Sequence, residues 1–401
     1  MPSRVFVTGL GIISGIGKDL GEHVTSLFDS RSGISGIRFL DTHLQGQIPV
    51  SEVKCSNEEL LVMSGLHPAG SYSRNTLLGV IAAREAFHHA RLGERTGLRT
   101  GLISATTVGG MDQCEKYYQD FLTNDSRNSY IEIYDCADST EKIALALGIT
   151  GYRTTISTAC SSAANAILYG ARLIRQGYLD RVVAGGTESL TVFHINGFNA
   201  LKILDKEPCK PFDARRNGIT LGEGAAYVIL ESEEAARAGA PGRFASLAGY
   251  GNACEAYHQT ASSPDGHGAY LAMKRALDMS GLDPSQIGYI NAHGTGTDNN
   301  DLSEGIAIER LFGENIPPVS STKPITGHTT SAAGSTEAIL AILGLKYGVI
   351  WPNLNFREPM PELKFTPVRE LMKNIPLEHV MSNSFGFGGN DTSLIFSKPI
   401  P

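Results

Sequence analysis

Two segments of this sequence are small and apolar on nearly every side of a helix, and they constrain the fold more than any other feature. One covers residues 161–176 and the other covers residues 331–347. A helix that is apolar all round has to be buried. Each segment has a reactive side chain at or just before its start, Cys160 in the first and His328 in the second. The chain must bury both helices, and the recurrence suggests an internal duplication.

Short β-branched segments bounded by glycine alternate with helical segments along the chain, which predicts an α/β fold. The expected strands cover residues 4–8, 100–104, 154–157, 181–184, 226–231, 289–291 and 393–396, and the further helices cover 75–90, 269–279 and 301–311. A weak echo supports the duplication, because RVFVTGLG at 4–11 and FASLAGYG at 244–251 are both strands that run into G-x-G.

We therefore expect two halves, an N-terminal one at residues 1–237 and a C-terminal one at residues 238–401. A polar connector that contains Gly and Pro, at residues 233–242, would join them. Residues 28–73 show no clear periodicity and are expected to form an insertion or a cap.

The amino-acid balance excludes several classes of function. The chain has 34 Lys and Arg against 41 Asp and Glu, a net charge of −7, and only 19% charged residues, so we expect no nucleic-acid partner. Its six cysteines form no CxxC pair and no short Cys/His spacing, which argues against a zinc site or a disulfide framework and favours a reducing, cytoplasmic location. No run of 18 apolar residues predicts a membrane span, and glycines interrupt the N-terminal apolar run too often for a signal peptide.

Cys160 lies in the sequence ISTACSSAAN, which predicts a strand, a tight turn of small residues and then a helix. The N–H groups at a helix N-terminus stabilise a thiolate, so this placement favours an activated thiol with a lowered pKa. A buried structural cysteine is the competing interpretation, and the placement leaves the two about equal.

Three further segments have residues suited to chemistry. His293 follows an expected strand in NAHGTGTD, and Lys323 and His328 lie in SSTKPITGH before the second apolar helix. Near the C-terminus, MSNSFGFGGND has glycines that would let backbone N–H groups approach a ligand, as an oxyanion hole requires. Taken singly, a turn histidine, a solvated lysine and a β-turn with core aromatics are competing interpretations.

Together these segments resemble, in order and spacing, the elongating β-ketoacyl-acyl carrier protein synthases of the thiolase superfamily. The resemblance spans essentially the whole chain and is carried by TACSS at 158–162, GGTE at 185–188, FDARRNG at 212–218, GEGA at 222–225, NAHGTGT at 291–297, KPITGH at 323–328 and NSFGFGG at 383–389. It implies a thiolase-like five-layered αβαβα fold built from two pseudo-repeats, and usually a homodimer.

The resemblance also implies a reaction, a decarboxylative Claisen condensation. Cys160 would take the acyl chain as a thioester, and His293 and His328 would donate hydrogen bonds to the malonyl thioester oxygen and stabilise the enolate left when CO2 departs. Lys323 would keep His328 neutral. The backbone N–H groups of Cys160 and Phe387 would form a second oxyanion hole, and Phe387 would also act as a gate to the acyl pocket.

Other positions match the family with substrate-binding or structural roles. Thr295 and Thr297 match threonines that bind the pantetheine arm, Val108 matches the residue that limits acyl-pocket depth, and the further substrate-binding candidates are Phe385, His258 and Thr260. Asp301, Glu304 and Glu337 match an acidic network. Asn291, Ala292, Glu337, Ser382 and Asn383 match positions that hold a monovalent cation in some relatives. No cofactor is implied beyond the phosphopantetheine of the carrier.

The sequence departs from many relatives near the gate. It has Arg216-Asn217-Gly218-Ile219 where they read R-D-G-F, and Asn390-Asp391 where they read T-N. The basic cluster that commonly docks an acidic carrier protein is absent from residues 60–74, so docking would use Lys202, Lys206 and Lys210, or a less acidic carrier. These departures favour a specialised pathway, such as aryl-polyene or polyketide-type synthesis, with the acyl carrier protein arriving in trans.

Four alternatives fit the sequence less well. Biosynthetic thiolases use a second cysteine, and initiating synthases combine Cys with His and Asn. A non-catalytic chain-length factor, the partner subunit of a ketosynthase heterodimer, typically lacks the nucleophilic cysteine that this chain has at Cys160. A cysteine hydrolase needs one histidine with an orienting carboxylate, whereas this chain has two histidines in separate glycine-rich loops.

Overall fold

The structure is a computed structural model that describes residues 4–239 and 242–399. Within these residues, its centre is a ten-stranded mixed sheet in the order β10-β9-β11-β12-β8-β1-β7-β6-β4-β5. The strands of this sheet are β1 (Val5–Ser14), β4 (Thr100–Ala105), β5 (Arg153–Ile156), β6 (Arg181–Glu188), β7 (Gly224–Ser232), β8 (Ala245–Cys254), β9 (Tyr289–Asn291), β10 (Val319–Ser320), β11 (His379–Gly386) and β12 (Asn390–Ser397). A separate ladder joins β2 (Ser35–Gly36) and β3 (Pro49–Val50).

The sheet contains the same five-stranded pattern twice. The order β1-β7-β6-β4-β5 in the first half corresponds to β8-β12-β11-β9-β10 in the second. In both halves the first two pairings are antiparallel and the last two are parallel. The halves meet where β1 pairs antiparallel with β8, with Phe6 opposite Ser246. This repeated topology confirms the expected duplication.

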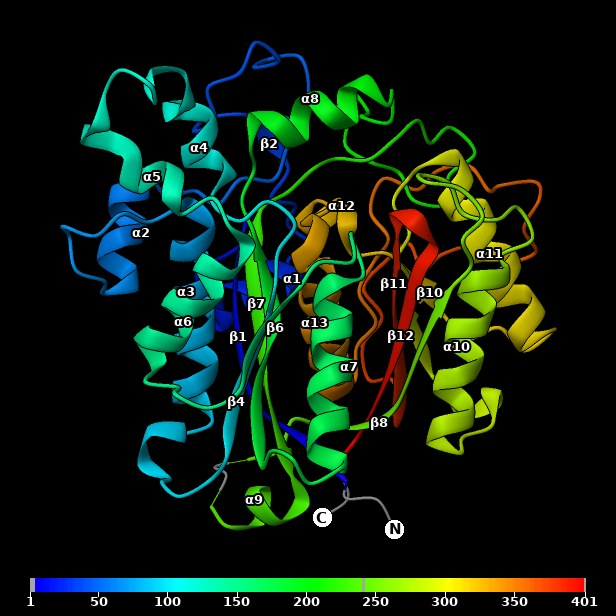
Figure 1. Cartoon of the computed structure of the whole chain (residues 1–401). Coiled ribbons are helices and arrows are strands. Elements are labelled where there is room, and N and C mark those ends of the chain that lie inside the picture. Colours follow the sequence, from blue (N-terminus) through cyan, green and yellow to red (C-terminus); the bar gives the residue numbers. More distant parts are fainter. Residues whose placement is uncertain (1–3, 240–241, 400–401) are drawn as a thin grey trace.

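Helices and the two half-sheets form five layers (Figure 1). The helices α7 (Ser162–Arg175) and α13 (Ala333–Tyr347) lie in the middle, where they pack against each other and against strands of both halves. The outer face of the first half is covered by α3 (Arg74–His89) and α6 (Cys136–Leu147), and that of the second by α10 (His267–Ser280) and α11 (Asp298–Phe312). The predicted αβαβα fold is confirmed, and the two apolar segments are its central layer.

Glycines in the first strand of each half allow a helix to approach closely. A Cβ added to Gly9 would lie 2.4 Å from the carbonyl oxygen of Ala86 in α3, and one added to Gly249 would lie 2.2 Å from that of Ala276 in α10. The next glycine of each G-x-G is placed in the same way. The prediction that the first strand ends at residue 8 was therefore wrong, because these glycines serve helix packing and β1 continues to Ser14.

Further helices were not predicted from the sequence. In Figure 1, α8 (Val192–Ala200) lies above one end of the sheet, over the central helices, whereas α4 (Met111–Tyr117) and α5 (Asn128–Glu132) lie to one side, above α3. The segment at 28–73, expected as an insertion or a cap, has little regular structure besides β2, β3 and α2 (Asn57–Ser64). The remaining α-helices are α1 (Leu20–Phe28), α9 (Glu233–Arg237) and α12 (Lys323–Thr326).

The expected connector at 233–242 begins with α9, and its residues 240–241 lie outside the described residues. The division into 1–237 and 238–401 stays a prediction. Within residues 4–239 and 242–399, no helix combines the length and the apolar character that a membrane crossing requires.

Candidate active site

Cys160 lies at a sharp turn between β5 and the central helix α7. Ala159, just before it, adopts the left-handed conformation with φ 51°, which a residue with a side chain rarely does. The turn is held by the Thr158 N–H, which donates to the Ser162 hydroxyl at 2.7 Å. The Cys160 side chain is buried, with 6% exposure, at the end of the central layer. The predicted strand, turn and helix around Cys160 are present.

The expected lowering of the Cys160 pKa is not what the structure gives. Burial raises the pKa of the Cys160 thiol to about 11, although the Lys323 charge and the Phe387 N–H group act in the opposite direction. The prediction considered only the helix N-terminus and not the desolvation of the thiol. In the free site, Cys160 is therefore a protonated thiol at neutral pH.

His328 contacts Cys160 directly. Its Nε2 atom lies 3.1 Å from the Cys160 Sγ atom, and its Nδ1 atom accepts a hydrogen bond from the Thr330 N–H at 3.3 Å. Because Nδ1 is an acceptor, the proton of a neutral imidazole has to be on Nε2. His328 therefore presents an N–H donor to the site.

His293 presents the same kind of donor by a different route. The Lys323 Nζ atom lies 3.2 Å from the His293 Nδ1 atom, and it also donates to the His293 carbonyl oxygen and pairs with Glu337. An ammonium group donates hydrogen bonds and accepts none, so Nδ1 is the acceptor and the His293 proton is on Nε2. The sequence predicted that Lys323 would keep His328 neutral, and the Lys323 charge does lower the pKa of His328, but the Lys323 side chain makes its hydrogen bonds to His293 and Glu337.

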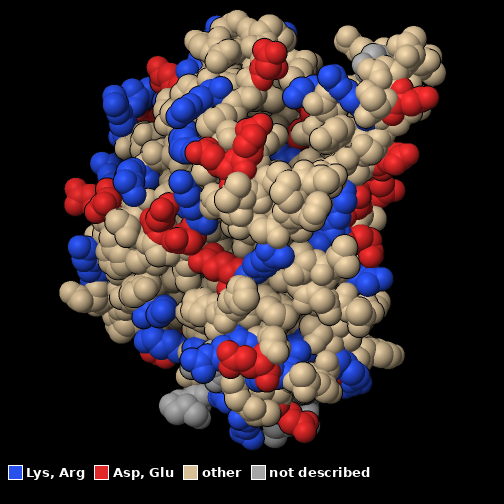
Figure 2. All heavy atoms as spheres, turned by 90° about the vertical axis from the view of Figure 1, so that its left-hand side faces the viewer, with Lys and Arg blue, Asp and Glu red and all other residues tan. Residues whose placement is uncertain are grey.

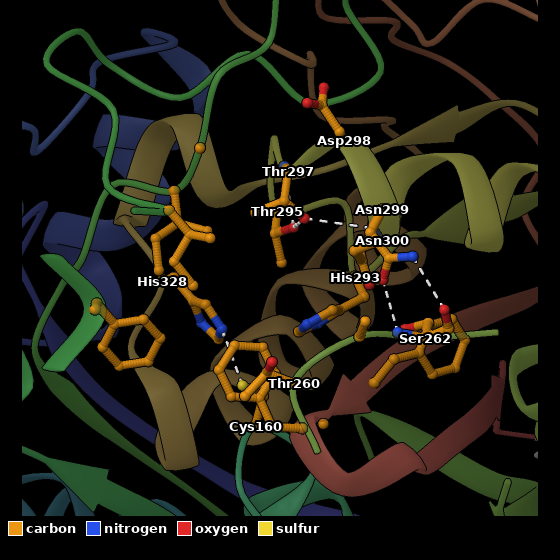
Figure 3. A pocket seen from close by; sticks show the side chains of 18 of the residues that line it. Cys160, Thr260, Ser262, His293, Thr295, Thr297, Asp298, Asn299, Asn300 and His328 are labelled. Atoms are coloured by element: carbon orange, nitrogen blue, oxygen red, sulfur yellow. Dashed lines mark hydrogen bonds between the residues drawn. The ribbon is translucent and has the colours of Figure 1, made fainter. Parts of the chain in front are cut away.

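Both imidazoles are neutral. Burial and the Lys323 charge hold the pKa values of His293 and His328 well below their ordinary range. Figure 3 shows the two rings on opposite sides of the pocket, both directed toward Cys160. The ligand atoms of these three residues all lie within 4.8 Å of one another. The set also has the ligand types of a metal site, but the neighbouring Lys323 charge opposes cation binding there.

The segment at 386–389, which precedes β12 and is called the Phe387 segment, places a backbone donor beside the thiol. The Phe387 N–H group hydrogen-bonds to the Cys160 sulfur. A Cβ added to Gly386 would lie 3.2 Å from the Cys160 nitrogen and 2.9 Å from the Thr158 carbonyl oxygen, so glycine permits this close approach. This geometry is suited to the oxyanion hole expected from Cys160 and Phe387.

Two buried carboxylates hold the loop at 293–297. Asp301 accepts hydrogen bonds from the N–H groups of Thr295 and Gly296, at 2.9 and 3.1 Å. Glu304 accepts from the N–H groups of His293 and Gly294, at 2.9 and 2.8 Å. Burial raises the pKa of Glu304 to about 7. Both residues of α11 therefore position the loop and do not face the reacting atoms.

A cavity of about 250 Å³ opens onto these groups. The predicted residues that line it are Cys160, Thr260, His293, Thr295, Thr297, His328, Phe385 and Phe387. His258 is exposed outside this lining, where its Nδ1 atom accepts the Thr260 N–H at 3.1 Å. Val108 is also outside the lining, buried in a loop that follows β4.

Some of the positions at which the sequence departs from the family that it resembles lie at this cavity. Asn217 and Ile219 line it. The Asn390 Oδ1 atom accepts three hydrogen bonds, from the Ser161 hydroxyl at 2.9 Å and from the amides of Asn165 and Asn252 at 2.8 and 2.9 Å. Asn390 thus joins the end of the Phe387 segment to the helix that follows Cys160.

The predicted cation positions give a partial fit. The Glu337 Oε2 atom is buried without a hydrogen-bond partner, as a cation ligand could be, and burial raises the pKa of Glu337 to about 7. The Asn383 Oδ1 atom already accepts the Ser393 hydroxyl at 2.7 Å. Asn291 contacts Thr322 and the Glu337 carbonyl, both at 3.4 Å. The unpartnered Glu337 Oε2 atom favours a cation here, whereas the Lys323 ammonium on the other Glu337 oxygen and the occupied Asn383 side chain oppose one.

The expected docking lysines differ in their surroundings. Lys202 lines the mouth of the cavity, and Lys206 is exposed. Lys210 forms ion pairs with Asp205 at 3.3 Å and Glu207 at 2.9 Å. Figure 2 shows that basic and acidic side chains are interspersed over the face that includes α2 and α3.

Two neighbours of the site were not predicted. The Phe198 ring in α8 lines the cavity and packs against the Phe387 ring, with 5.9 Å between centroids. Glu188 contacts the turn that follows His328. The only sequence feature that included Glu188 was the GGTE motif at 185–188, and this motif did not indicate a role for the residue.

The chain is similar to known proteins over its whole length. Two family models match it, "Beta-ketoacyl synthase, N-terminal domain" at residues 2–236 and "Beta-ketoacyl synthase, C-terminal domain" at residues 244–357. The 3-oxoacyl-[acyl-carrier-protein] synthase 2 of Staphylococcus aureus (strain COL) is 33% identical over 408 residues, which cover 98% of each chain.

Solved structures are also similar to the chain over its whole length. The ishigamide ketosynthase/chain length factor has a TM-score of 0.92 and 32% identity, and the match covers 100% of both chains. A ketosynthase bound to a hexaketide, in complex with its type II PKS acyl-carrier protein, has a TM-score of 0.87 and 26% identity, again over 100% of both chains.

Proposed function

The chain belongs to the β-ketoacyl synthase family, and from this membership we propose that it condenses an acyl chain held on Cys160 with malonyl-acyl carrier protein. The products are 3-oxoacyl-carrier protein and CO2. One observation carries the proposal: the Nε2 atom of His328 lies 3.1 Å from the Cys160 sulfur, and both histidines have Nδ1 occupied so that Nε2–H faces the same point. A site with two neutral N–H donors and one thiol is suited to stabilising an enolate beside a thioester.

The first step is acyl transfer to Cys160. The sulfur attacks the thioester carbonyl of the acyl carrier, the N–H groups of Cys160 and Phe387 hold the oxyanion, and the carrier thiolate leaves. The proton of the Cys160 thiol passes to the departing carrier thiol, so the exchange is balanced. Because the free thiol has a raised pKa, this proton is lost only with substrate in place.

The second step begins with malonyl-carrier protein. The Nε2–H groups of His293 and His328 donate to its thioester oxygen, and the carboxylate leaves as CO2 with its bonding electrons going to the enolate. The enolate carbon attacks the acyl thioester on Cys160, and the tetrahedral intermediate expels the Cys160 thiolate. The thiolate then accepts a hydrogen bond from His328 until it regains a proton.

We propose that Thr295 and Thr297 bind the pantetheine arm, since both line the cavity between its mouth and His293. Their hydroxyls lie 2.9 Å apart and offer a polar contact to an amide-bearing chain. The carrier would dock in trans at the mouth beside Lys202. No further cofactor is part of the proposal, and a cation at Glu337 would lie beside the Lys323 ammonium that already pairs with that carboxylate.

We propose a specialised pathway of the polyketide or aryl-polyene type as the setting. Asn217, Ile219 and Asn390 make the cavity mouth and the Phe387 segment chemically different from those of many relatives.

We also propose a homodimer and a cytoplasmic location. The sheet ends at β5, whose edge is partly exposed beside Tyr152, and the six cysteines are all unpaired thiols.

A chain-length-factor role fits the site less well, because Cys160 and both histidines converge. Intact-protein mass spectrometry tests the proposal: purified protein is mixed with a panel of acyl-carrier proteins, and one acyl mass should appear on Cys160. Addition of malonyl-carrier protein should then remove that mass and give 3-oxoacyl-carrier protein. A protein that forms no Cys160 thioester with any primer would contradict the proposal, and native mass spectrometry of the same sample reports the oligomeric state.

A further inference from the structure

Glu188 lies at the end of β6, fully buried between two segments of the site. Its Oε1 atom accepts hydrogen bonds from the Thr106 hydroxyl at 2.7 Å and from the Val108 N–H at 3.2 Å. Its Oε2 atom accepts from the Thr330 hydroxyl and the Ser331 N–H, both at 3.2 Å. One carboxylate therefore joins the loop after β4 to the turn that follows His328.

The surroundings of this carboxylate are unusual for a buried charge. Within residues 4–239 and 242–399, the hydrogen bonds that Glu188 accepts come from hydroxyls and backbone N–H groups alone, including those of Thr107. A buried carboxylate without a cation is costly, and the hydrogen bonds offset that cost only if all the donors stay in place. Glu188 therefore fixes the donors around it.

The turn after His328 is strained and needs such support. Thr330 adopts the left-handed conformation with φ 45°, which is unfavourable for a β-branched residue. Its N–H group is the donor that occupies the His328 Nδ1 atom. If the turn relaxed, this N–H would move away, and the imidazole could place its proton on Nδ1 instead of Nε2.

The other carboxylate oxygen of Glu188 contacts the loop that is expected to end the acyl pocket. This Oε1 atom accepts a hydrogen bond from the N–H of Val108, the residue expected to limit acyl-pocket depth. Residues 106–108 and the turn at 330–331 thus share one acceptor. A shift in either segment changes the hydrogen bonds available to the other.

We propose that Glu188 is a positioning residue that holds the Thr330 N–H against His328 and ties this turn to the loop that ends the acyl pocket. The inference rests on the proposed function. Glu188 does not touch the reacting atoms and acts through Thr330 on the enolate-stabilising donor. It also makes the acyl-length preference and the decarboxylation step depend on the same side chain.

The test is Glu188→Gln, which keeps the size of the side chain but turns one acceptor oxygen into a donor NH2 group that faces other donors. Decarboxylation of malonyl-carrier protein is measured in a Cys160→Gln background, and Cys160 acylation is measured separately with the nucleophile intact. We expect kcat for decarboxylation to fall roughly 10- to 100-fold, with KM within about twofold, as for a small displacement of a catalytic group. Condensation should also shift its preference among acyl lengths.

Two further variants separate positioning from loss of stability. Glu223→Gln removes another buried carboxylate, one that pairs with Arg74 and accepts the N–H groups of Val53 and Leu190. It should lower the melting temperature and leave decarboxylation within about twofold, because among the described residues the hydrogen bonds of the Glu223 side chain go to Val53, Arg74 and Leu190 and not to residues 106–108 or 330–331. Thr330→Gly in the Glu188→Gln background should restore much of the decarboxylation rate, since glycine adopts the left-handed conformation without strain.

The outcomes distinguish the two proposals. If the unmutated enzyme neither forms a Cys160 thioester nor decarboxylates malonyl-carrier protein, the proposed function fails. If it does both, and folded Glu188→Gln decarboxylates at the unmutated rate, only the role of Glu188 is wrong. Equal losses in Glu188→Gln and Glu223→Gln would also overturn it, because they would reflect destabilisation alone.

Discussion

The Lys323 ammonium lies 3.2 Å from the Nδ1 atom of His293, and this contact sets which nitrogen of the imidazole carries the proton. The Thr330 N–H group does the same for His328. One histidine is thus oriented by a charge and the other by a backbone amide, and both present Nε2–H to the cavity. Burial, together with the cation beside His293, holds the pKa of this imidazole well below the ordinary range, so the ring stays a neutral donor.

We predict that Lys323→Met lowers malonyl-carrier decarboxylation by roughly 100-fold, about the effect of losing one oxyanion donor. Without the ammonium, the His293 proton is free to occupy Nδ1, and the pKa of His293 rises toward its ordinary value. Decarboxylation kinetics and NMR of 15N-histidine-labelled protein report the two effects. Lys274→Met, which removes an exposed lysine paired with Asp278 on α10, is the matched control and should change neither. An unchanged His293 resonance in Lys323→Met would contradict this account.

The two histidines should contribute unequally to the two half-reactions. His328 contacts the Cys160 sulfur, whereas no hydrogen bond joins His293 to that sulfur among the described residues. In a Cys160→Gln background, His293→Ala and His328→Ala should each lower decarboxylation by 100-fold or more, on the order of a lost oxyanion-hole donor. With Cys160 intact, His328→Ala should slow acylation more than His293→Ala does. Mass spectrometry of the acyl-enzyme over time measures this difference, and equal acylation rates would contradict it.

Alkylation of Cys160 should depend steeply on pH. Burial raises the thiol pKa to about 11, and only the thiolate reacts with iodoacetamide, so the rate should rise about tenfold per pH unit from pH 7 to pH 10. Lys323→Met should lower the rate at each pH, because the Lys323 charge lowers this pKa in the unmutated protein. Exposed Cys254 in the same sample is the internal control. A plateau below pH 8 would show instead that the thiol is activated in the free site.

The motif residues could be recognised from the sequence because each lies at a strand end or a helix start, which are local features. Cys160, His293 and His328 are indeed placed at such points. The pKa of Cys160 could not be predicted in this way, because burial in the folded chain raises it, and the groups that oppose this rise, the Lys323 charge and the Phe387 N–H group, are distant in the sequence. Local signals alone predicted a lowered pKa for Cys160, whereas burial raises it.

The fold shows the same division between local and distant causes. The two apolar helices and the α/β class followed from periodicity, but Gly9 and Gly249 looked like strand ends and are contact points for helices. The role of Glu188 could not be predicted from the sequence, because its hydrogen-bond donors come from residues 106–108 and 330–331, which meet only in the folded chain.

Asp391 gives a further prediction, on stability. It is 2% exposed, and burial together with Glu255 and Glu304 raises its pKa to about 8. The Asp391 and Glu255 carboxylates converge on Gly268, where an added Cβ would lie 2.2 Å from one oxygen and 2.7 Å from the other. Because the folded state holds this proton and the unfolded state releases it near pH 4, the free energy of unfolding should fall as the pH rises from about 4 to about 8.

Asp391→Asn removes this dependence, since the amide is neutral at every pH. The variant should be more stable than the unmutated protein at pH 8, by at least about 1.4 kcal/mol, the equivalent of one pKa unit, and the gain should shrink toward pH 4. Urea unfolding at pH 5, 6.5 and 8 measures the difference. Asp278→Asn, at an exposed carboxylate of α10, serves as the control and should shift the three values by similar small amounts. If Asp391→Asn were destabilising by the same amount at all three pH values, Asp391 would be ionised in the folded protein and its carboxylate would instead be a required acceptor.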